Sequence, residues 1–366
     1  MAQKLSRSPL VTVALMAVCL AVVLIYLVKT RPEAPRPGAA ALSADAAGST
    51  PEPAPEPFKR SRELLGTVVT IQVLAEDTAQ AEALAEVGFA EIARLHALLA
   101  PVGEQSEVAR LNAAAGGEPV KIGPDLLAVL EEAMLTAQLS GGAFDPTWAA
   151  MAPLWDLKDD PPRIPDAAAA TAAAGRVDCG KLEVEAKAGT ARLAEAGMAV
   201  GLGGVAKGYA IDRAVLAMRA SGGKHLLVDA GGDLYASGRK GRSRQWSIGV
   251  RDPRDRDKLL GKIPLQDEAV TTSGDYERFA IVEGKRYHHI LDPRTGMPAA
   301  GSRSVTVLAK TAMQADALST ALFVMGPEQA IKLANRLEGV EALVVDAEGR
   351  SLMTPGMAKR FARIGP

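Results

Sequence analysis

The sequence has few of the residues on which several common kinds of protein depend. It contains only two cysteines, Cys19 and Cys179, among 366 residues. Two cysteines exclude a disulfide scaffold and a cysteine-rich zinc or iron–sulfur site, and four histidines leave little room for a histidine-rich metal site. Aromatic residues make up 4% of the chain, so we expect a core built mainly from alanine, valine and leucine.

The chain also has no excess of charge of either sign. It carries 42 lysine and arginine residues against 43 aspartate and glutamate residues, a formal net charge of −1. A nucleic-acid-binding protein normally shows a basic excess or a basic stripe, so we expect no nucleic-acid partner. Hydrophobic residues make up 48% and charged residues 23%, which excludes a chain that is disordered throughout.

The N-terminal region predicts a membrane anchor. Residues 10–28 form a run of 19 residues that is apolar except for Thr12. As a helix this run would be about 28 Å long, close to the hydrocarbon thickness of a bilayer. We therefore expect a short tail at residues 1–9 and a transmembrane helix at residues 10–28. A cleaved signal peptide is the alternative, although residues 24–28 lack the small side chains of a cleavage site.

The segment at residues 29–57 predicts a linker. Seven prolines lie between Pro32 and Pro57, and the other residues there are mostly alanine, glutamate, serine and glycine. Such a composition has little to bury and favours extended conformations. We interpret it as a stalk that holds a domain at residues 58–366 away from the membrane; a disordered tail without mechanical purpose would have the same composition. A short tail ahead of a large domain favours export of that domain.

The region from residue 58 onward predicts one large α+β domain with mixed or antiparallel sheets and packed helices. Strand-like segments outnumber those that one βαβ unit needs, and they cluster late in the chain. Residues 161–175 are rich in proline and alanine and predict a surface excursion. The expected helices are 78–99, 124–139, 205–220, 315–325 and 327–337. The expected strands are 67–73, 225–228, 246–250, 278–282, 287–291, 304–308 and 342–346.

A glycine-rich loop precedes one of these helices. It reads Gly201-Leu-Gly203-Gly204-Val-Ala-Lys207-Gly208-Tyr209. A loop of this kind directs free N–H groups and the positive end of the helix dipole toward an anion, and Lys207 adds a charge. The spacing matches neither the Rossmann fingerprint nor the P-loop.

Two further clusters combine turn residues with reactive groups. In the segment 140–147, Asp145-Pro146 predicts a turn in which Asp145 bonds the backbone beyond it, with Phe144 placed inside the turn. The second cluster runs from Tyr287 to Gly296. Its two consecutive histidines would point to opposite faces of a strand, so at most one faces a given site. A histidine provides a base, and Arg294 provides an anion clamp.

Asp316 and Thr320 lie four residues apart on an otherwise apolar predicted helix and therefore share one face. A buried carboxylate needs a partner. Asp316 either caps the N-terminus of the helix or joins the Thr320 hydroxyl in binding a hard cation. Oxygen ligands favour Mg²⁺ or Ca²⁺ over zinc. Glycine loops, a lysine, a histidine and a cation site together suit chemistry on a phosphate or pyrophosphate.

Six motifs in this order resemble the ApbE family, the FAD:protein FMN transferases, over roughly residues 60–350. They are Ser-Gly-Gly-Ala-Phe-Asp-Pro-Thr (140–147), Gly-Gly-Val-Ala-Lys-Gly-Tyr-Ala-Ile-Asp (203–212), Gly-Gly-Asp (231–233), Thr-Ser-Gly-Asp-Tyr (272–276), His-Ile-Leu-Asp-Pro-Arg-Thr-Gly (289–296) and Ala-Asp-Ala-Leu-Ser-Thr-Ala (315–321).

The resemblance implies a function and a set of site residues. It implies transfer of FMN from FAD to a threonine hydroxyl of an acceptor protein, with release of AMP and with Mg²⁺ as cofactor. The implied metal ligands are the carbonyl of Gly204 and the side chains of Asp316 and Thr320. The implied FAD contacts are Ala143, Phe144, Asp145, Lys207 and Ile290, together with Leu65, Val102 and Gly201, where the family usually has methionine, tyrosine and aspartate.

His289 would be the base or a phosphate contact, and Asp275 would orient either His289 or the metal. Two alternatives remain open at this point. One is an FAD pyrophosphatase in which water replaces the acceptor hydroxyl, and the other is a non-catalytic FAD-binding protein. With the anchor, the resemblance implies a single-pass protein of a bacterial inner membrane with a periplasmic catalytic domain.

Overall fold

The structure is a computed structural model that describes residues 56–241 and 244–364. The predicted tail at residues 1–9, the predicted anchor at residues 10–28 and nearly all of the predicted linker at residues 29–57 lie outside the described residues. Among the helices that the structure describes, none combines the length and the hydrophobicity needed to cross a bilayer.

The centre of the domain is an eight-stranded sheet in which every neighbouring pair of strands is antiparallel. Its strands, in spatial order, are β1 (Phe58–Leu64), β2 (Thr67–Leu74), β6 (His225–Ala230), β7 (Asp233–Ser237), β10 (Glu268–Gly274), β13 (Ser302–Ala309), β14 (Glu341–Asp346) and β15 (Ser351–Met353). This spatial order follows chain order throughout, with other elements inserted between some neighbouring strands, so hairpins and near neighbours build most of the sheet.

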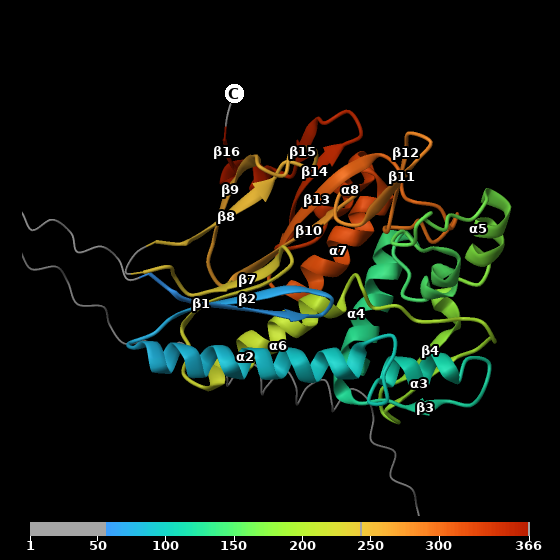
Figure 1. Cartoon of the computed structure of the whole chain (residues 1–366), viewed down its shortest axis with the longest axis horizontal. Helices are drawn as coiled ribbons and strands as arrows, with labels where there is room; N and C mark the ends of the chain where they lie inside the picture. Colours follow the sequence, from blue (N-terminus) through green and yellow to red (C-terminus); the bar gives the residue numbers. More distant parts are fainter. Residues whose placement is uncertain (1–55, 242–243, 365–366) are drawn as a thin grey trace, which may run out of the picture. The chain divides into compact units, whose positions relative to one another are not determined.

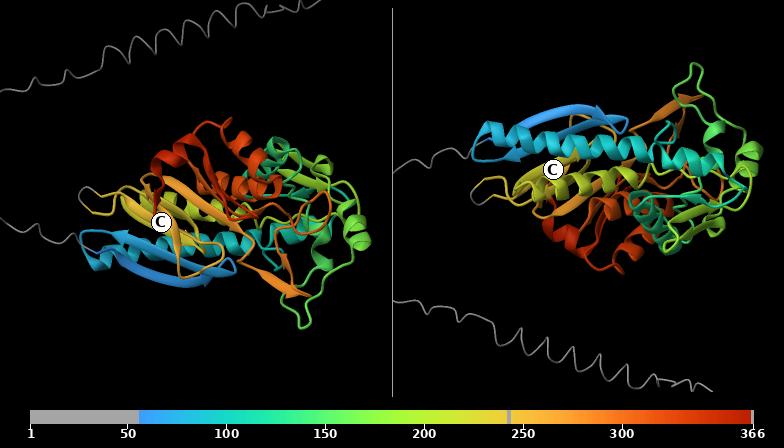
Figure 2. Two further views of the ribbon diagram at one scale, coloured as in Figure 1. Left: turned by 90° about the horizontal axis from the view of Figure 1, so that it is seen from above. Right: turned by 90° about the horizontal axis from the view of Figure 1, so that it is seen from below.

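Helices cover one face of this sheet. Helix α2 (Thr78–Leu99) contacts β1 and β2, α6 (Ala206–Ala220) contacts β6 and β7, α7 (Ala312–Met325) contacts β10 and β13, and α8 (Pro327–Ala334) contacts β14. The view from below in Figure 2 shows α2 and α6 side by side, as their contacts require. Helix α4 (Pro124–Ser140) packs on α7 (Figure 1). The larger hydrophobic core lies between these helices and the sheet.

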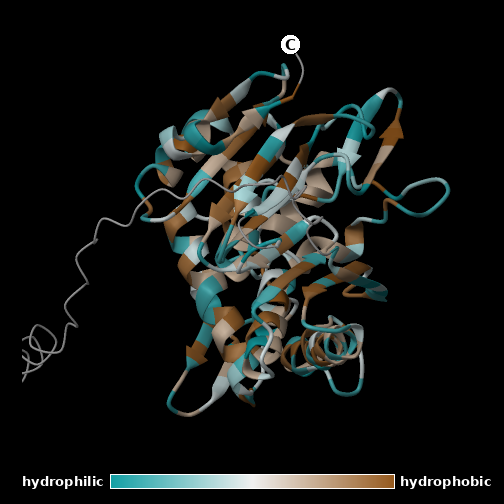
Figure 3. Cartoon of the chain, turned by 90° about the vertical axis from the view of Figure 1, so that its left-hand side faces the viewer, coloured by the Kyte–Doolittle hydropathy of each residue, from teal (hydrophilic) through white to brown (hydrophobic). Residues whose placement is uncertain are grey.

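A smaller core lies on the opposite face of the sheet. There Leu227, Val270 and Leu308 pack with Trp246 and Ile263. The covering layer is a three-stranded sheet, in the order β16 (Ala362–Arg363), β9 (Leu259–Leu265) and β8 (Trp246–Arg251), with helix α9 (Pro355–Arg360). Hydrophobic residues run through the strands and helices, whereas the peripheral loops are largely hydrophilic (Figure 3). The helices, the eight-stranded sheet and the small sheet with α9 therefore form three layers.

The remaining elements lie outside these three layers or connect them. They are α3 (Glu107–Ala113), α5 (Ala167–Ala174), the 3₁₀ helices η1 (Ala149–Leu154) and η2 (Cys179–Lys181), the sheet of β3 (Val120–Lys121), β5 (Thr190–Leu193) and β4 (Leu182–Glu185), and the hairpin of β11 (Phe279–Val282) and β12 (Lys285–His288).

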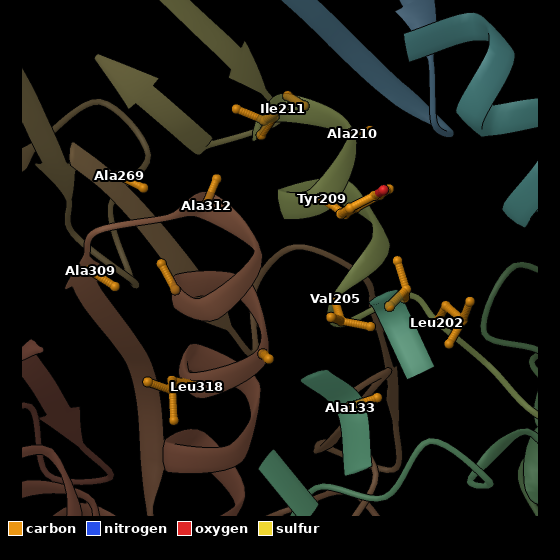
Figure 4. Close-up of a cluster of buried hydrophobic side chains, with 14 of the residues drawn as sticks. Ala133, Leu202, Val205, Tyr209, Ala210, Ile211, Ala269, Ala309, Ala312 and Leu318 are labelled. Carbon is orange, nitrogen blue, oxygen red and sulfur yellow. The ribbon is translucent and has the colours of Figure 1, made fainter. Parts of the chain in front are cut away.

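Helices α6 and α7 approach each other closely because small residues line their contact. A β-carbon at Gly208 would fall on the carbonyl of Ala312, so only glycine fits there. The Asp212 carboxylate accepts hydrogen bonds from the N–H groups of Ala312 and Met313 at 2.8 and 2.9 Å. Figure 4 shows Ala210 of α6, Ala312 of α7 and Ala133 of α4 in this region. The start of α7 is thus attached to the side of α6.

The α+β class and most predicted elements are confirmed, and three predictions need correction. Residues 161–175 are not only a surface excursion, because they contain α5, whose Ala170 is buried. The strand predicted at residues 287–291 ends at His288. Helix α7 begins at Ala312 and is capped by Thr311, so the alternative in which Asp316 caps the helix is wrong.

Candidate active site

A pocket of about 640 Å³ lies at one end of the central sheet. Its wall includes the glycine loop before α6, the turn between β6 and β7, the end of β10 and one face of α7. The β1–β2 turn and the segments 143–148 and 289–293 complete the wall. The pocket contains most of the predicted site residues, namely Leu65, Ala143, Phe144, Asp145, Gly204, Lys207, His289, Ile290, Asp316 and Thr320.

The glycine loop and α7 meet at an ion pair. The Lys207 ammonium lies 3.0 and 3.1 Å from the two carboxylate oxygens of Asp316. The Gly208 N–H donates to the same carboxylate at 3.0 Å. These contacts join residues that are more than 100 positions apart in the sequence. The structure therefore brings together the lysine and the aspartate that the sequence analysis treated as separate signals.

A second carboxylate shares the same lysine. Asp233 Oδ2 lies 2.8 Å from Lys207 Nζ, and the Asp233 side chain is only 6% exposed. Burial raises the pKa of Asp316 above its usual range, and the negative charge of Asp233 contributes to the rise although Lys207 opposes it. Burial acts to lower the pKa of Lys207, but the Asp233 and Asp316 carboxylates outweigh it and raise that pKa above its usual range.

Hydroxyl groups surround the next turn of α7. Thr320 Oγ1 lies 3.3 Å from the Ser273 hydroxyl on β10, which is 2.8 Å from the Ser319 hydroxyl. Gly204 lies directly opposite, since a β-carbon there would be 2.9 Å from Thr320 Oγ1. Asp316, Thr320 and the backbone at Gly204 thus form one oxygen-rich corner of the pocket.

This corner fits a hard cation. Within residues 56–241 and 244–364, no three or more His, Cys, Asp and Glu side chains gather as a metal site. Mg²⁺ does not need such a group, because it is commonly bound through one or two carboxylates together with substrate phosphates and water. Asp316, the Thr320 hydroxyl and the Gly204 carbonyl are oxygen donors of the type that Mg²⁺ prefers.

His289 faces the pocket and its protonation is determined by its neighbours. Its Nδ1 lies 3.2 Å from the carbonyl oxygen of Arg278. A carbonyl only accepts hydrogen bonds, so Nδ1 carries the proton and Nε2 keeps its lone pair. The protein around the pocket partly desolvates the His289 ring, although its side chain stays exposed, and lowers its pKa to about 4; the positive charges of Arg278 and Lys207 add to the effect. The ring is therefore neutral near pH 7 and is able to accept a proton at Nε2.

The adjacent His288 points the other way, as predicted for consecutive histidines. It is buried, its Nε2 lies 3.0 Å from the Ala299 carbonyl, and its ring meets the edge of Phe323. Burial lowers its pKa. His288 therefore supports the segment that carries His289.

Asp145 forms the predicted turn and holds two chain segments together. Its Oδ1 accepts hydrogen bonds from the Thr147 N–H at 2.7 Å and from the Thr147 hydroxyl at 2.6 Å. Its Oδ2 accepts from the Cys179 N–H at 2.9 Å. These contacts place Ala143 and Phe144 in the pocket wall.

Three predicted site residues do not line the pocket. Val102 lies in an exposed loop on a separate shallow surface beside α2. The Gly201 carbonyl accepts from Trp148 Nε1 at 2.9 Å, so Gly201 supports a lining residue. The Asp275 carboxylate is bonded at both oxygens to Arg254, at 2.7 Å each. This geometry does not support the prediction that Asp275 orients His289 or a metal.

The prediction for Arg294 is also revised. Its guanidinium is bonded to Asp292 at 2.8 and 2.7 Å within the same turn, so it is not directed at a bound anion. The pocket instead contains Arg278 and Glu277, which were not among the predicted site residues. Asp233 was named only as the last residue of the Gly-Gly-Asp motif (231–233). Its signal was an acidic residue directly after Gly231-Gly232, but nothing local indicates which lysine it would meet.

The sheet, the helical layer and the pocket define a protein with the architecture of the flavin transferases of known structure. The Pseudomonas stutzeri flavinyl transferase ApbE superimposes with a TM-score of 0.73 at 28% identity, covering 85% of this chain and 98% of that one. The ApbE protein from Thermotoga maritima gives a TM-score of 0.78 at 33% identity, covering 84% and 100%.

The chain belongs to the ApbE family, whose model matches residues 65–344. It is also similar to the FAD:protein FMN transferase of Treponema pallidum. The two are 35% identical over 319 residues, which cover 83% of this chain and 88% of the relative.

Proposed function

We propose that the protein transfers FMN from FAD to a hydroxyl group of an acceptor protein and releases AMP. The observation that carries the proposal is the contact between Lys207 of the glycine loop and Asp316 of α7 within one pocket. A glycine loop at a helix N-terminus suits a phosphate, and a carboxylate with a hydroxyl suits a hard cation. The pocket therefore combines the groups that chemistry on a dinucleotide diphosphate requires. The family relatives carry the same activity in their names.

The transfer exchanges the phosphoanhydride bond of FAD for a phosphate ester bond to the acceptor. The acceptor hydroxyl oxygen attacks the phosphorus on the FMN side of FAD, and the bond from that phosphorus to the bridging oxygen breaks. FMN becomes a phosphoester of the acceptor, and AMP leaves with the bridging oxygen. His289 Nε2 accepts the hydroxyl proton, because Nδ1 is already protonated toward the Arg278 carbonyl. Positioned general bases of this kind contribute on the order of 10²- to 10⁴-fold to the rate.

We propose Mg²⁺ as the cofactor and a threonine as the acceptor residue. Asp316, Thr320 and the Gly204 carbonyl would hold the ion. When bound, it would neutralise the negative charge of the diphosphate. Lys207 and the N–H groups of the glycine loop would orient the phosphates. Phe144 and Ile290 would contact the apolar parts of FAD from the pocket wall.

We also propose that residues 10–28 anchor the protein in a bacterial inner membrane, with the catalytic domain in the periplasm. The support is the apolar run followed by a proline-rich segment. Protease treatment of spheroplasts tests this directly. We expect the catalytic domain to be digested from the outside while a cytoplasmic marker survives; protection of the domain would contradict the proposal.

The transfer itself is tested with purified protein, FAD, Mg²⁺ and a flavin-accepting subunit of a membrane redox complex. We expect an FMN-sized mass increase on the acceptor and one AMP per transfer, lost with EDTA and in Asp316→Asn. Free FMN with no protein-bound FMN would instead indicate a pyrophosphatase. Bound FAD that is never cleaved would indicate a flavin-binding protein.

A further inference from the structure

The Lys207 ammonium lies where several oxygens converge. Its Nζ is 2.8 Å from Asp233 Oδ2, 3.0 and 3.1 Å from the two oxygens of Asp316, and 3.1 Å from the Gly203 carbonyl oxygen. Two carboxylates and a carbonyl around one cationic centre resemble the surroundings of a bound cation. In this arrangement the ammonium competes with any metal ion for Asp316.

The two carboxylates differ in their other partners. Asp316 also accepts the Gly208 N–H and shares a helix face with Thr320. Asp233 begins β7 directly after the Gly231-Gly232 turn and pairs in the ladder with Ala230. Within the described part of the chain, Lys207 is the only side chain bonded to the Asp233 carboxylate. The two acids and one base leave one negative charge in excess when all three are ionised.

We propose that Asp233 is a positioning residue that keeps the Lys207 ammonium in place when Asp316 binds a divalent cation and no longer pairs with Lys207. Asp233 and Asp316 belong to different elements, so the ammonium is able to keep one carboxylate while releasing the other. The ammonium also stays beside the glycine loop, where it would meet a phosphate. Without Asp233, Asp316 would be the sole carboxylate partner of Lys207, and the ion pair would block the cation site.

The inference rests on the proposed function, but its test needs neither FAD nor an acceptor. Mn²⁺ alone serves as the probe, because it takes the same oxygen ligands as Mg²⁺ and free Mn²⁺ is counted by electron paramagnetic resonance. The binding constant is measured for the full chain, for Asp233→Asn, for Lys207→Met and for the double variant.

We expect Lys207→Met to bind Mn²⁺ at least threefold more tightly than the wild type, because the competing ammonium is gone. We expect Asp233→Asn to weaken binding at least tenfold in the presence of Lys207. The same substitution in the Lys207→Met background should weaken binding less than a third as much. The amount by which Asp233→Asn weakens Mn²⁺ binding more with Lys207 present than with Lys207→Met measures the positioning role, as in any double-mutant cycle.

Three results would overturn the inference. Equal effects of Asp233→Asn in both backgrounds would show that Asp233 acts only through its charge. A larger effect in the Lys207→Met background would show that Asp233 binds the ion directly. Weaker Mn²⁺ binding by Lys207→Met would show that the ammonium does not compete, and no binding by the wild type at millimolar concentration would show that Asp233 does not free Asp316 for a cation.

The matched control is Asp229→Asn. Asp229 is an acid in the same hairpin, but its Oδ1 accepts the Gly232 N–H and does not contact Lys207. We expect its Mn²⁺ affinity to stay within twofold of the wild type. Lys207→Gln repeats the test with a polar side chain if Lys207→Met does not fold. Flavin transfer is assayed separately, so a protein that transfers FMN without the coupling would refute this inference alone.

Discussion

Gly204 provides the most direct test of the proposed cation corner. A methyl group at this position would lie 2.9 Å from Thr320 Oγ1, 3.3 Å from Thr320 Cβ and 3.2 Å from Phe144 Cε2. Ordinary contacts of this kind are about 3.5–4.0 Å. Gly204→Ala would therefore force the glycine loop and α7 apart by about half an ångström or more.

The cost follows from the packing of this region. Thr320 is half-buried in the pocket wall, and because overpacking of a well-packed core costs about 1–3 kcal/mol of the free energy of unfolding, we expect a cost near the lower end of that range. The same displacement moves the Thr320 hydroxyl away from the Gly204 carbonyl. We expect Mg²⁺ affinity to fall about tenfold to a hundredfold, which corresponds to about 1.4–2.8 kcal/mol.

Gly203→Ala is the matched control. A β-carbon at Gly203 would meet no atom within 4 Å, so we expect its free energy of unfolding and Mg²⁺ affinity to remain near those of the wild type. Chemical denaturation measures the first quantity and titration calorimetry the second. If Gly204→Ala and Gly203→Ala behave alike, the corner is not packed as described and the argument for a cation between Gly204 and Thr320 fails.

Three further predictions use other parts of the structure. Because the pKa of His289 is about 4, we expect that protonation of His289 does not reduce the rate of flavin transfer between pH 8 and 5 in a pH–rate profile. A decrease of the rate near pH 6.5 that disappears in His289→Gln would contradict this. Burial raises the pKa of Asp212 from 3.8 to about 6, so the folded state holds this proton more tightly. The protonated Asp212 carboxyl therefore stabilises the folded state below pH 3.8, and this stabilisation is lost as the pH rises through 6. Asp212→Asn should reduce the decrease of the free energy of unfolding with pH in urea titrations, whereas an unchanged dependence on pH would refute the assignment. Arg254→Ala leaves the buried Asp275 carboxylate unpaired and should lower the free energy of unfolding by about 1–3 kcal/mol, the cost of an unsatisfied buried acceptor, as measured by thermal unfolding, whereas Asp275→Asn that abolishes transfer without lowering Tm would restore a catalytic role for Asp275.

Helices and strands with a clear local sequence pattern were predicted correctly, and those without one were missed. The helical spacing at residues 78–99 matches α2, which buries one face against the sheet. The β-branched run at residues 67–73 lies within β2. Strand β10 was not predicted, because threonine, serine and glycine at its end indicate a turn as readily as a strand. Helix α5 was not predicted either, since the prolines before it obscured the capping residue Asp166.

The same distinction between local and long-range signals holds for the site residues. Motifs identified Lys207, His289 and Asp316 because each has a local reason to be unusual. The partner of each depends on long-range packing, which no local pattern contains. Asp233 reaches Lys207 only through the pairing of β6 with β7, and Asp275 is bonded to Arg254 from the loop that joins β8 and β9 of the separate three-stranded sheet.

The close contact between α6 and α7 determines which part of the pocket wall is free to move. Gly208 fits against the Ala312 carbonyl and Asp212 holds the first N–H groups of α7, so the wall that bears the lysine and the acid behaves as one rigid block. A flavin nucleotide that enters the pocket has to be accommodated by the other parts of the wall. These include the tight Leu65-Gly66 bend and the segment that carries His289, and substrate-dependent motion should be concentrated there.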